Sequence, residues 1–395
     1  MLKCASIFTY EIDDRKTALD EINKQLSENI VLLENSVGII MCHPEFIDSG
    51  MLGFICGNLP FDVAGVTTAA QAINDEAGEL ILTIFIITSN DVRFKTGIAE
   101  NLEKGLDLSV KAAYDKASAG ETEAPRLALI FPPILLDYFA GDDYVKTWEN
   151  LIPETPLFGT LAMDDTATFE DSEILYNGKN SKNAMSFILC YGNINPSFII
   201  GTMPEGKEAH YTGEVTKSIG SVVREINGIN AYKYFESIGF EKDGQSTVNY
   251  LFVPFKLDQK TRKDYDGVPV VRVLSFFSDE GSATFHGDVD EGSTFSLLRC
   301  EPDDVLSAAK ESAGKVISLP EVNGLLMFSC IVRRIVTMSA SGMEVNEEFK
   351  VIKNTLPSGI PFMIGCAGGE ICPTVSGTGA LTNRYHEYTL IILAI

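Results

Sequence analysis

The hydrophobic pattern changes period within the first part of the chain. Leu19, Ile22 and Leu26 recur at helical spacing behind a pair of aspartates, either of which can cap a helix. The run that follows, SVGIIMC, is short, apolar and partly β-branched, and it predicts a buried strand. A helix followed by a buried strand is typical of proteins in which helices cover a sheet.

A proline, an apolar stretch and a glycine occur in this order three times. The copies are LPFDVAG, TPLFG and IPFMIG. Upstream of each copy lies another apolar run, and a segment that can form a helix lies between the two. A strand, a crossover helix and a parallel strand need about 30 residues, and their connection is almost always right-handed. The sequence therefore predicts three strand–helix–strand units, at 37–65, 127–159 and 325–365.

Each unit is followed by a further apolar run. These runs, ELILTIFIITS, AMSFILCYGN and YTLIILAI, predict strands that return antiparallel to the unit, so the sheets should be mixed. A helix that begins at Thr96 and carries Ile98, Leu102 and Leu106 is expected to cover one sheet face. The segment 301–316 predicts a second covering helix.

The clearest interruption of the apolar pattern is the segment 201–214, which is rich in Gly, Pro and charged residues. A chain of 395 residues is longer than one core usually organises, so two domains are expected. We place them at 1–205, with two of the units, and at 206–395, with the third. The predicted fold class is α/β (α+β), with mixed sheets that are covered by helices.

The charge of the chain narrows the choice of partners. It has 55 acidic and 31 basic residues, a formal net charge of −24, and no basic cluster. Such a surface repels phosphate backbones and anionic lipids, so we expect neither nucleic acid nor a membrane as a partner. The N-terminus lacks the pattern of a signal peptide, which favours a cytoplasmic protein. The eight scattered cysteines are most simply buried, reduced thiols.

Several segments resemble known motifs without meeting their chemistry. GTMPEGKE has the frame of a phosphate-binding loop, but Glu208 replaces the Ser or Thr that would bind Mg²⁺. The acidic turn from Asp288 has its glycine one position early, and Arg299 stands in place of the last calcium ligand. Cys42 and His43 are adjacent in a predicted strand and therefore point to opposite faces. We expect no metal and no cofactor.

Polar chemistry is concentrated near the C-terminus, in three segments that end or follow predicted strands. They supply Cys330 and Arg333, then Gly369 and Glu370, then Asn383, Arg384, Tyr385, His386 and Tyr388. If these strands end at one edge of a sheet, the groups converge on a crevice of the kind that holds ligands in α/β proteins. Backbone N–H groups beside glycines, next to one carboxylate, suit a zwitterion. A structural ion pair between Glu370 and an arginine explains the same residues equally well.

The last of these segments, NRYHEYT, predicts which side chains share a face. In a fully extended strand, Asn383 and Tyr385 would face one side, and Arg384, His386 and Tyr388 the other. We expect the second set to line the crevice, because Arg384 and His386 add polar donors and Tyr388 adds a partly apolar wall.

These segments resemble the FIST sensory domain, a family named from F-box and intracellular signal transduction proteins. The C-terminal half is similar in FSCIVR, GCAGGEI and NRYHEYT, and the N-terminal half in LPFDVAGVTT and ETPLFGTLAMDD, so the resemblance covers nearly the whole chain. It implies FIST N- and C-terminal domains that bind a small ligand such as an amino acid and signal through a partner protein in trans. On this chain it implies ligand-binding residues at Cys330, Arg333, Gly365, Gly369, Glu370, Asn383, Arg384 and His386.

Two other functions fit the same sequence. Cys330 and His386 lie in one polar cluster and could serve as nucleophile and base of a hydrolase or transferase. Alternatively, the acidic surface could bind a basic protein partner, in a complex that weakens as salt is added. A small-ligand sensor is the function that we expect first.

Overall fold

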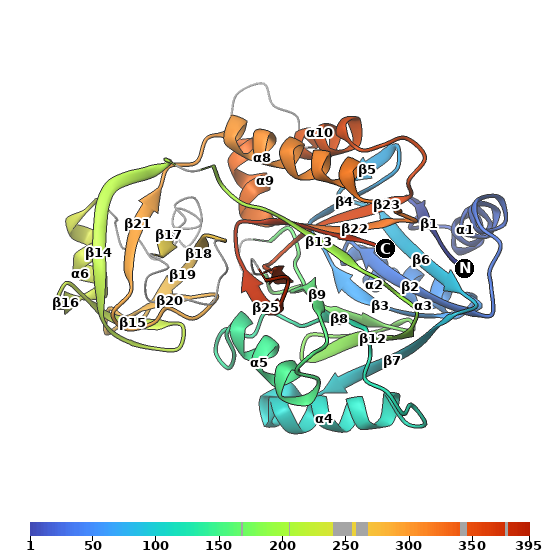
Figure 1. Cartoon of the computed structure of the whole chain (residues 1–395), viewed down its shortest axis with the longest axis horizontal. Helices are drawn as coiled ribbons and strands as arrows, with labels where there is room; N and C mark the ends of the chain where they lie inside the picture. Colours follow the sequence, from blue (N-terminus) through green and yellow to red (C-terminus); the bar gives the residue numbers. More distant parts are fainter. Residues whose placement is uncertain (167–168, 205, 240–254, 258–267, 340–345, 376–377) are drawn as a thin grey trace.

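The computed structural model of the protein describes residues 1–166, 169–204, 206–239, 255–257, 268–339, 346–375 and 378–395. These residues form three six-stranded sheets, gathered into one body, and an eight-stranded sheet that projects to one side of it (Figure 1). Each of the three smaller sheets is built on one of the predicted units. The protein is therefore a mixed α/β (α+β) structure, as predicted.

The three smaller sheets share one strand order: an edge strand, a returning strand, the two strands of a unit, and a hairpin. The first sheet consists of β1 (Leu2–Thr9), β6 (Leu82–Ser89), β2 (Asn35–Cys42), β3 (Asp62–Thr67), β10 (Ile174–Tyr176) and β11 (Lys179–Ser181). The second consists of β7 (Val92–Glu100), β12 (Ala184–Gly192), β8 (Leu127–Phe131), β9 (Leu157–Thr160), β24 (Glu370–Val375) and β25 (Leu381–His386). The third consists of β13 (Ser197–Gly201), β26 (Leu390–Ala394), β22 (Leu325–Cys330), β23 (Phe362–Ala367), β4 (Ala70–Ile73) and β5 (Glu76–Gly78).

Strand direction within these sheets follows the sequence pattern. The two strands of each unit are parallel, in the pairs β2–β3, β8–β9 and β22–β23. The returning strands β6, β12 and β26 are antiparallel to the first strand of their unit. The three predicted units and the mixed character of the sheets are therefore confirmed.

The hairpin at the end of each sheet comes from a different unit of the chain. The β4–β5 hairpin follows β3 along the chain but pairs with β23 in the third sheet. Likewise β10 follows β9 but pairs with β3, and β24 follows β23 but pairs with β9. Because every unit completes the sheet of another, the three units form a single body.

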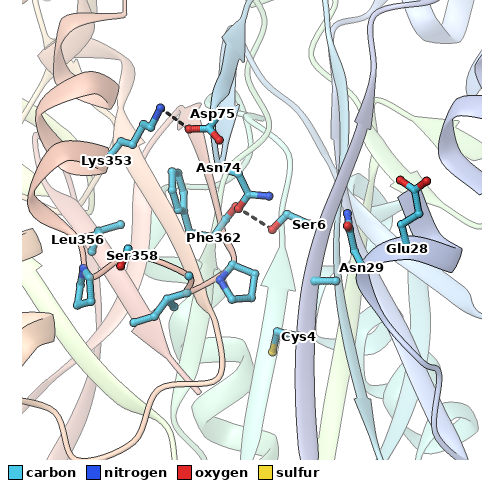
Figure 2. Close-up of a pocket in the computed structure, with 15 residues that line it drawn as sticks. Cys4, Ser6, Glu28, Asn29, Asn74, Asp75, Lys353, Leu356, Ser358 and Phe362 are labelled. Atoms are coloured by element: carbon cyan, nitrogen blue, oxygen red, sulfur yellow. Dashed lines mark hydrogen bonds and ion pairs between the residues drawn. The ribbon is translucent and has the colours of Figure 1, made fainter. Parts of the chain in front are cut away.

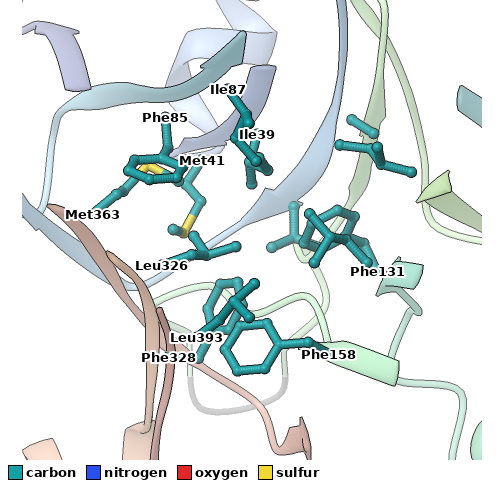
Figure 3. Packing of buried hydrophobic residues seen from close by; sticks show 14 of the residues in the cluster. Ile39, Met41, Phe85, Ile87, Phe131, Phe158, Leu326, Phe328, Met363 and Leu393 are labelled. Carbon is teal, nitrogen blue, oxygen red and sulfur yellow. The ribbon is translucent and has the colours of Figure 1, made fainter. Parts of the chain in front are cut away.

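The core of this body lies between the three sheets. Side chains alternate along each strand, so that Ile39 and Met41 of β2 point inward while Ile40 points outward. Figure 3 shows the inward-pointing residues of the three sheets meeting, with Phe131 and Phe158 from the second sheet and Phe328 from the third. The rings of Phe158 and Phe328 are 5.6 Å apart, which joins these two sheets directly.

Helices cover the outer faces of the three sheets. The first sheet is covered by α1 (Arg15–Asn29), α2 (Glu45–Asp48) and α3 (Met51–Cys56), the second by α4 (Leu106–Ala117) and α5 (Gly141–Leu151), and the third by α8 (Pro302–Lys315) and α10 (Glu347–Thr355). Asp14 caps α1, because its carboxylate accepts the N–H groups of Lys16 and Thr17 at 2.9 and 3.3 Å. The 3₁₀ turns η1 (Leu102–Lys104) and η2 (Val316–Ser318) precede α4 and follow α8.

The helix expected from Thr96 was wrong over its first ten residues, 96–105. Residues up to Glu100 belong to β7, which pairs with β12 along its whole length. The helix begins only at Leu106, after Asn101 and Gly105 have taken φ values of +56° and +151°. Tertiary pairing with β12 decided the conformation of a segment whose own periodicity is ambiguous.

The eight-stranded sheet lies between β13 and α8 in the sequence and has a core of its own. It consists of β14 (Glu208–Ile219), β15 (Val222–Ile226), β16 (Ile229–Asn230), β17 (Phe255–Leu257), β18 (Val270–Arg272), β19 (Leu274–Phe277), β20 (Ala283–Phe285) and β21 (Thr294–Leu298), with the helix α6 (Ala231–Ser237) packed on it. The boundary expected at 205 and 206 falls between β13 and β14. Residue 205 lies outside the described residues, and a division into domains at this point stays a prediction.

Candidate functional site

The three polar segments near the C-terminus meet around Thr389. Cys330 ends β22, Glu370 opens β24, and Thr389 directly precedes β26. The N–H of Cys330 donates to the carbonyl oxygen of Thr389 at 3.0 Å, and the Thr389 hydroxyl donates to Glu370 Oε2 at 2.7 Å. On its other side, Glu370 is paired in register with His386 of β25. Residues that are far apart in the sequence thus come into contact at one place.

Glu370 is a fully buried carboxyl group with one unused oxygen. Its Oε2 accepts from the Thr389 hydroxyl and, at 3.3 Å, from the Thr389 N–H, whereas Oε1 has no hydrogen-bond partner among the residues that the structure describes. Burial raises the pKa of Glu370 well above its ordinary value, and the Thr389 bonds and the charge of Arg333 offset this only in part. Burial therefore favours the protonated form of this carboxyl group, and an approaching cation would favour the ionised form.

Glu387, in the turn between β25 and β26, is a second buried carboxyl group whose charge interacts with Glu370. Its Oε2 accepts from the N–H of Val273, and its Oε1 lies 4.0 Å from Arg272 Nε without forming a hydrogen bond to any described residue. Burial raises the pKa of Glu387 to about 8, while the charge of Arg272 lowers it. The sequence prediction missed this residue. Its position between Tyr385 and Tyr388, directly before an apolar strand, could have identified it as a candidate.

Two tyrosines lie at this site: Tyr385 interacts with the two carboxyls, and Tyr388 interacts with Cys300 and Arg333. Tyr385 and Tyr388 are fully buried, and neither hydroxyl has a hydrogen-bond partner in the described part of the chain. A Cβ at Gly369 would lie only 2.2 Å from the hydroxyl oxygen of Tyr385, so that hydroxyl sits directly against the residue before Glu370. Electrostatic interaction with both Glu370 and Glu387 raises the pKa of Tyr385 further, after burial as the main cause.

The predicted alternation along NRYHEYT does not extend to Tyr388. The strand β25 ends at His386, and Tyr388 has a φ of +63° in the turn that follows. Assigning Tyr388 to one face with Arg384 and His386 was therefore wrong, because alternation holds only while the chain stays extended. Tyr385, which the alternation assigns to the opposite face, reaches Gly369.

Arg333 lies in the helix α9 (Ile331–Met338) and is fully buried. Its Nε and Nη2 donate to Oε1 of Glu348 at 3.0 and 2.7 Å, and Nη2 also donates to the carbonyl of Val305 at 3.3 Å. Its Nη1 has no partner among the described residues. The ion pair of Arg333 is thus made with Glu348 of α10.

Five residues at this site each have a buried polar atom without a hydrogen bond among the described residues, and we call them the Glu370 cluster: Arg333, Glu370, Tyr385, Glu387 and Tyr388.

The other residues predicted for the site have structural contacts. Asn383 accepts from the N–H of Leu157 at 2.8 Å and donates to the carbonyl of Thr155 at 3.0 Å. Arg384 Nη1 donates to its neighbour's carbonyl at 3.3 Å, and His386 Nε2 lies 2.9 Å from the carbonyl oxygen of Cys372. Gly365 faces the central core, where a Cβ would lie 2.4 Å from the sulfur of Met41.

Comparison with known families agrees with the order of these segments. The family model for the FIST N domain matches residues 36–229, and that for the FIST C domain matches residues 230–373. The chain belongs to the FIST family. FIST domains are sensory domains of signal transduction, so the protein has a sensory role. No curated protein matches the chain. The two FIST matches meet inside β16, within the eight-stranded sheet.

The Cys330 thiol of this FIST protein is not prepared for nucleophilic attack. Burial, followed by the nearby charge of Glu370, raises its pKa well above the ordinary value. Burial lowers the pKa of His386 to about 4. A reactive thiolate–imidazolium pair requires both shifts in the opposite direction. The geometry gives a hydrolase or transferase built on these two residues no support.

Further features of the FIST chain bear on its chemistry. All eight cysteines are free. Within the described ranges, no helix combines the length and apolarity that a membrane crossing needs. Over the same residues, no three side chains of His, Cys, Asp or Glu come together in a way that could hold a metal ion.

Proposed function

We propose that the protein is a cytoplasmic sensor that binds a small metabolite carrying an ammonium group, such as an amino acid, at the Glu370 cluster. The observation that supports this is the set of unused polar atoms in the cluster, namely two carboxyl oxygens, two tyrosine hydroxyls and one guanidinium nitrogen. Buried polar atoms in native proteins almost always have a partner, and each one left without costs about 1–3 kcal/mol. A ligand that supplies the missing partners would recover that free energy.

The chemistry of the cluster favours a cationic group on the ligand. Glu370 and Glu387 both have raised pKa values because they are buried, and an ammonium group between them would favour their ionised forms. The hydroxyls of Tyr385 and Tyr388 can accept from the same group or donate to a neighbouring oxygen. Nη1 of Arg333 offers one donor for a carboxylate. An amino acid carries both groups, whereas a purely anionic metabolite would leave the two carboxyls without a counter-charge.

The position of Glu387 suggests how binding would be transmitted. Its second oxygen holds the N–H of Val273, between β18 and β19 of the eight-stranded sheet. A ligand that interacts with Glu387 would alter this hydrogen bond, and it would therefore shift the eight-stranded sheet relative to the body. In our proposal a partner protein, acting in trans, recognises the changed surface.

A thermal-shift screen of amino acids and organic acids against the full chain tests the binding proposal. At 100 times its dissociation constant, a ligand should add about 2.7 kcal/mol to the free energy of unfolding. Glu370→Gln should abolish this gain. The charge-matched control Glu154→Gln, at an exposed position, should retain it.

Calorimetry of the stabilising compound in buffers with different ionisation enthalpies adds an independent readout. Because burial raises the pKa of Glu387 to about 8, an ammonium group that favours its ionised form should make binding release protons to the buffer near pH 7. A screen without any stabilising compound, or a ligand that stabilises Glu370→Gln as strongly as the unmodified protein, would contradict the proposal.

A further inference from the structure

A groove of about 750 Å³ lies between β1 and the loop 356–361, which connects α10 to β23 (Figure 2). One wall is formed by Cys4, Ala5 and Ser6 of β1, together with Glu28 and Asn29 at the end of α1. The other wall is mostly apolar and is formed by Leu356, Pro357, Ile360, Pro361 and Phe362. No member of the Glu370 cluster lines this groove.

The wall formed by β1 is the edge of the first sheet. Among the described strands it pairs with β6 alone, so alternate residues of β1 direct their main-chain N–H and C=O groups away from the sheet. Phe8 identifies which residues these are, because its N–H donates to Gln25 Oε1 at 3.1 Å and its carbonyl accepts from Gln25 Nε2 at 2.7 Å. By the same alternation, the main-chain groups of Leu2, Cys4 and Ser6 also point away from β6.

This edge is closed at one end and open at the other. Gln25 occupies the main-chain groups of Phe8, and Ser6 is buried where its hydroxyl donates to the carbonyl of Phe362 at 2.8 Å. Leu2 and Cys4 are partly exposed, and within the described ranges no hydrogen bond reaches the outward main-chain groups of Cys4. An open strand edge is a template for another extended chain.

The charge beside the open edge indicates the sign of its partner. Glu28 is exposed and forms no ion pair with any described residue, and the last turn of α1 contains no basic residue. The carbonyl end of a helix carries partial negative charge, which adds to that of Glu28. Two lysines lie nearby: Lys353 is engaged by Asp75 at 2.5 Å, and Lys3 of β1 lines a neighbouring groove together with Glu28. The whole chain carries a net charge of −24.

From these observations we infer that the groove binds an extended, basic segment of a partner protein, which adds as a strand to β1 at Leu2 and Cys4. Main-chain hydrogen bonds to Cys4 would supply affinity, and alternate side chains would contact the apolar wall at Ile360 and Pro361. A Lys or Arg of the segment would meet Glu28. This site is separate from the Glu370 cluster and does not depend on a ligand there.

Selection of a displayed library of random peptides, each about nine residues long, on the full chain tests this inference. We expect enrichment of β-branched peptides with at least one basic residue. The enriched peptide is then synthesised, and its dissociation constant is measured by fluorescence anisotropy.

Two variants test the contacts of this peptide. Cys4→Pro removes the outward N–H while leaving the β6 pairing intact, and it should weaken binding at least tenfold, by about 1.4 kcal/mol. Glu28→Lys should have a similar effect, which replacing the peptide's basic residue by Glu should reverse.

Two matched variants separate the site from general effects. Cys4→Ala keeps the N–H and loses only the thiol, and Asp20→Lys makes the same charge change at an exposed position of α1 outside the groove. Both should bind the peptide within about twofold of the unmodified protein. Failure to enrich any peptide, or equal binding to Cys4→Pro in a variant with an unchanged melting temperature, would overturn the inference. A dimer that Cys4→Pro dissociates would overturn it too, and would identify the occupant as a second copy of the chain.

Discussion

Single residues around the Glu370 cluster owe their position to unusual backbone angles. Gly369 has a φ of +129°, a value that favours glycine, and Tyr388 has a φ of +63°. The first lets β24 begin directly against the Tyr385 hydroxyl, and the second turns the Tyr388 side chain into the interior. The chemistry of the cluster therefore depends on the two turns as much as on the identity of the side chains.

Gly369→Ala should lower the free energy of unfolding by at least about 2 kcal/mol, because the new Cβ adds a close contact with Tyr385 to the backbone strain. Urea denaturation measures this. Gly379→Ala is the matched control, since Gly379 has a φ of +83° and a Cβ added there would have no atom within 4 Å. Gly379→Ala should show the cost of the backbone strain alone. Equal losses of unfolding free energy for the two variants would contradict the contact with Tyr385.

The buried histidines make a second prediction at this scale. Burial lowers the pKa of both His286 and His386 to about 4, from an ordinary value of 6.5. Their contribution to stability is complete above pH 6.5 and is lost as the pH falls toward 4, because the unfolded chain then binds the protons. Chemical denaturation between pH 4 and 7 should show a shallower dependence for His286→Gln and His386→Gln than for the unmodified protein. If the unfolding free energy of the variants and of the unmodified protein changed with pH in parallel, the lowered histidine pKa values would be contradicted.

At the scale of elements, the exchanged hairpins explain why three similar units make one body. The sequence predicted the parallel pair and the returning strand of each unit, because these are close in the chain and carry a strong apolar pattern. It did not predict that β24 would pair with β9 across the body. That pairing depends on which strand edge is still unpaired once the sheets have assembled. The local sequence pattern carries no information about it.

Asn383 fastens the β24–β25 hairpin to the second sheet by two hydrogen bonds, to Leu157 and Thr155. Asn383→Ala leaves a buried main-chain N–H and a buried carbonyl without these partners, so it should cost about 2–4 kcal/mol of unfolding free energy. Equilibrium unfolding in urea measures the loss. Asn23→Ala, on the exposed face of α1, should change stability by less than about 0.5 kcal/mol. A similar small change for Asn383→Ala would mean that the hairpin is held by its apolar contacts alone.

At the scale of the whole molecule, the eight-stranded sheet is attached to the body through charged groups. Arg272 Nη2 lies 3.2 Å from Asp142 Oδ2 of α5, and Lys146 of the same helix lies 2.7 Å from Asp288. Glu387, beside Arg272, holds the N–H of Val273. These polar contacts include the buried pair of Arg272 with Asp142 and the partly exposed pair of Lys146 with Asp288, and an apolar cluster that contains Val271 and Val273 adds to the attachment.

The raised pKa of Glu387 predicts a pH dependence with a definite sign. Its folded pKa of about 8 exceeds the ordinary value of 4.5, so its contribution to stability is complete below pH 4.5 and is lost as the pH rises through 8. The charged groups facing it are Arg272, which lowers this pKa, and Asp142, which raises it. Glu387→Gln should flatten the fall in unfolding free energy between pH 6 and 9. An identical fall in the variant would assign the dependence to other groups, Glu370 among them.

The sequence by itself determined the local elements of this protein. Periodicity gave the three units, the returning strands and the capped first helix, because each is encoded by residues close together in the chain. It also drew attention to Glu370, through the glycines that precede it. Only the tertiary structure decided which hairpin completes which sheet, that Thr96 belongs to a strand, and that Glu387 and Tyr385 lie beside Glu370. These outcomes depend on burial and on edges that exist only after distant segments have packed together, and burial is also what raises the pKa of the two carboxyl groups.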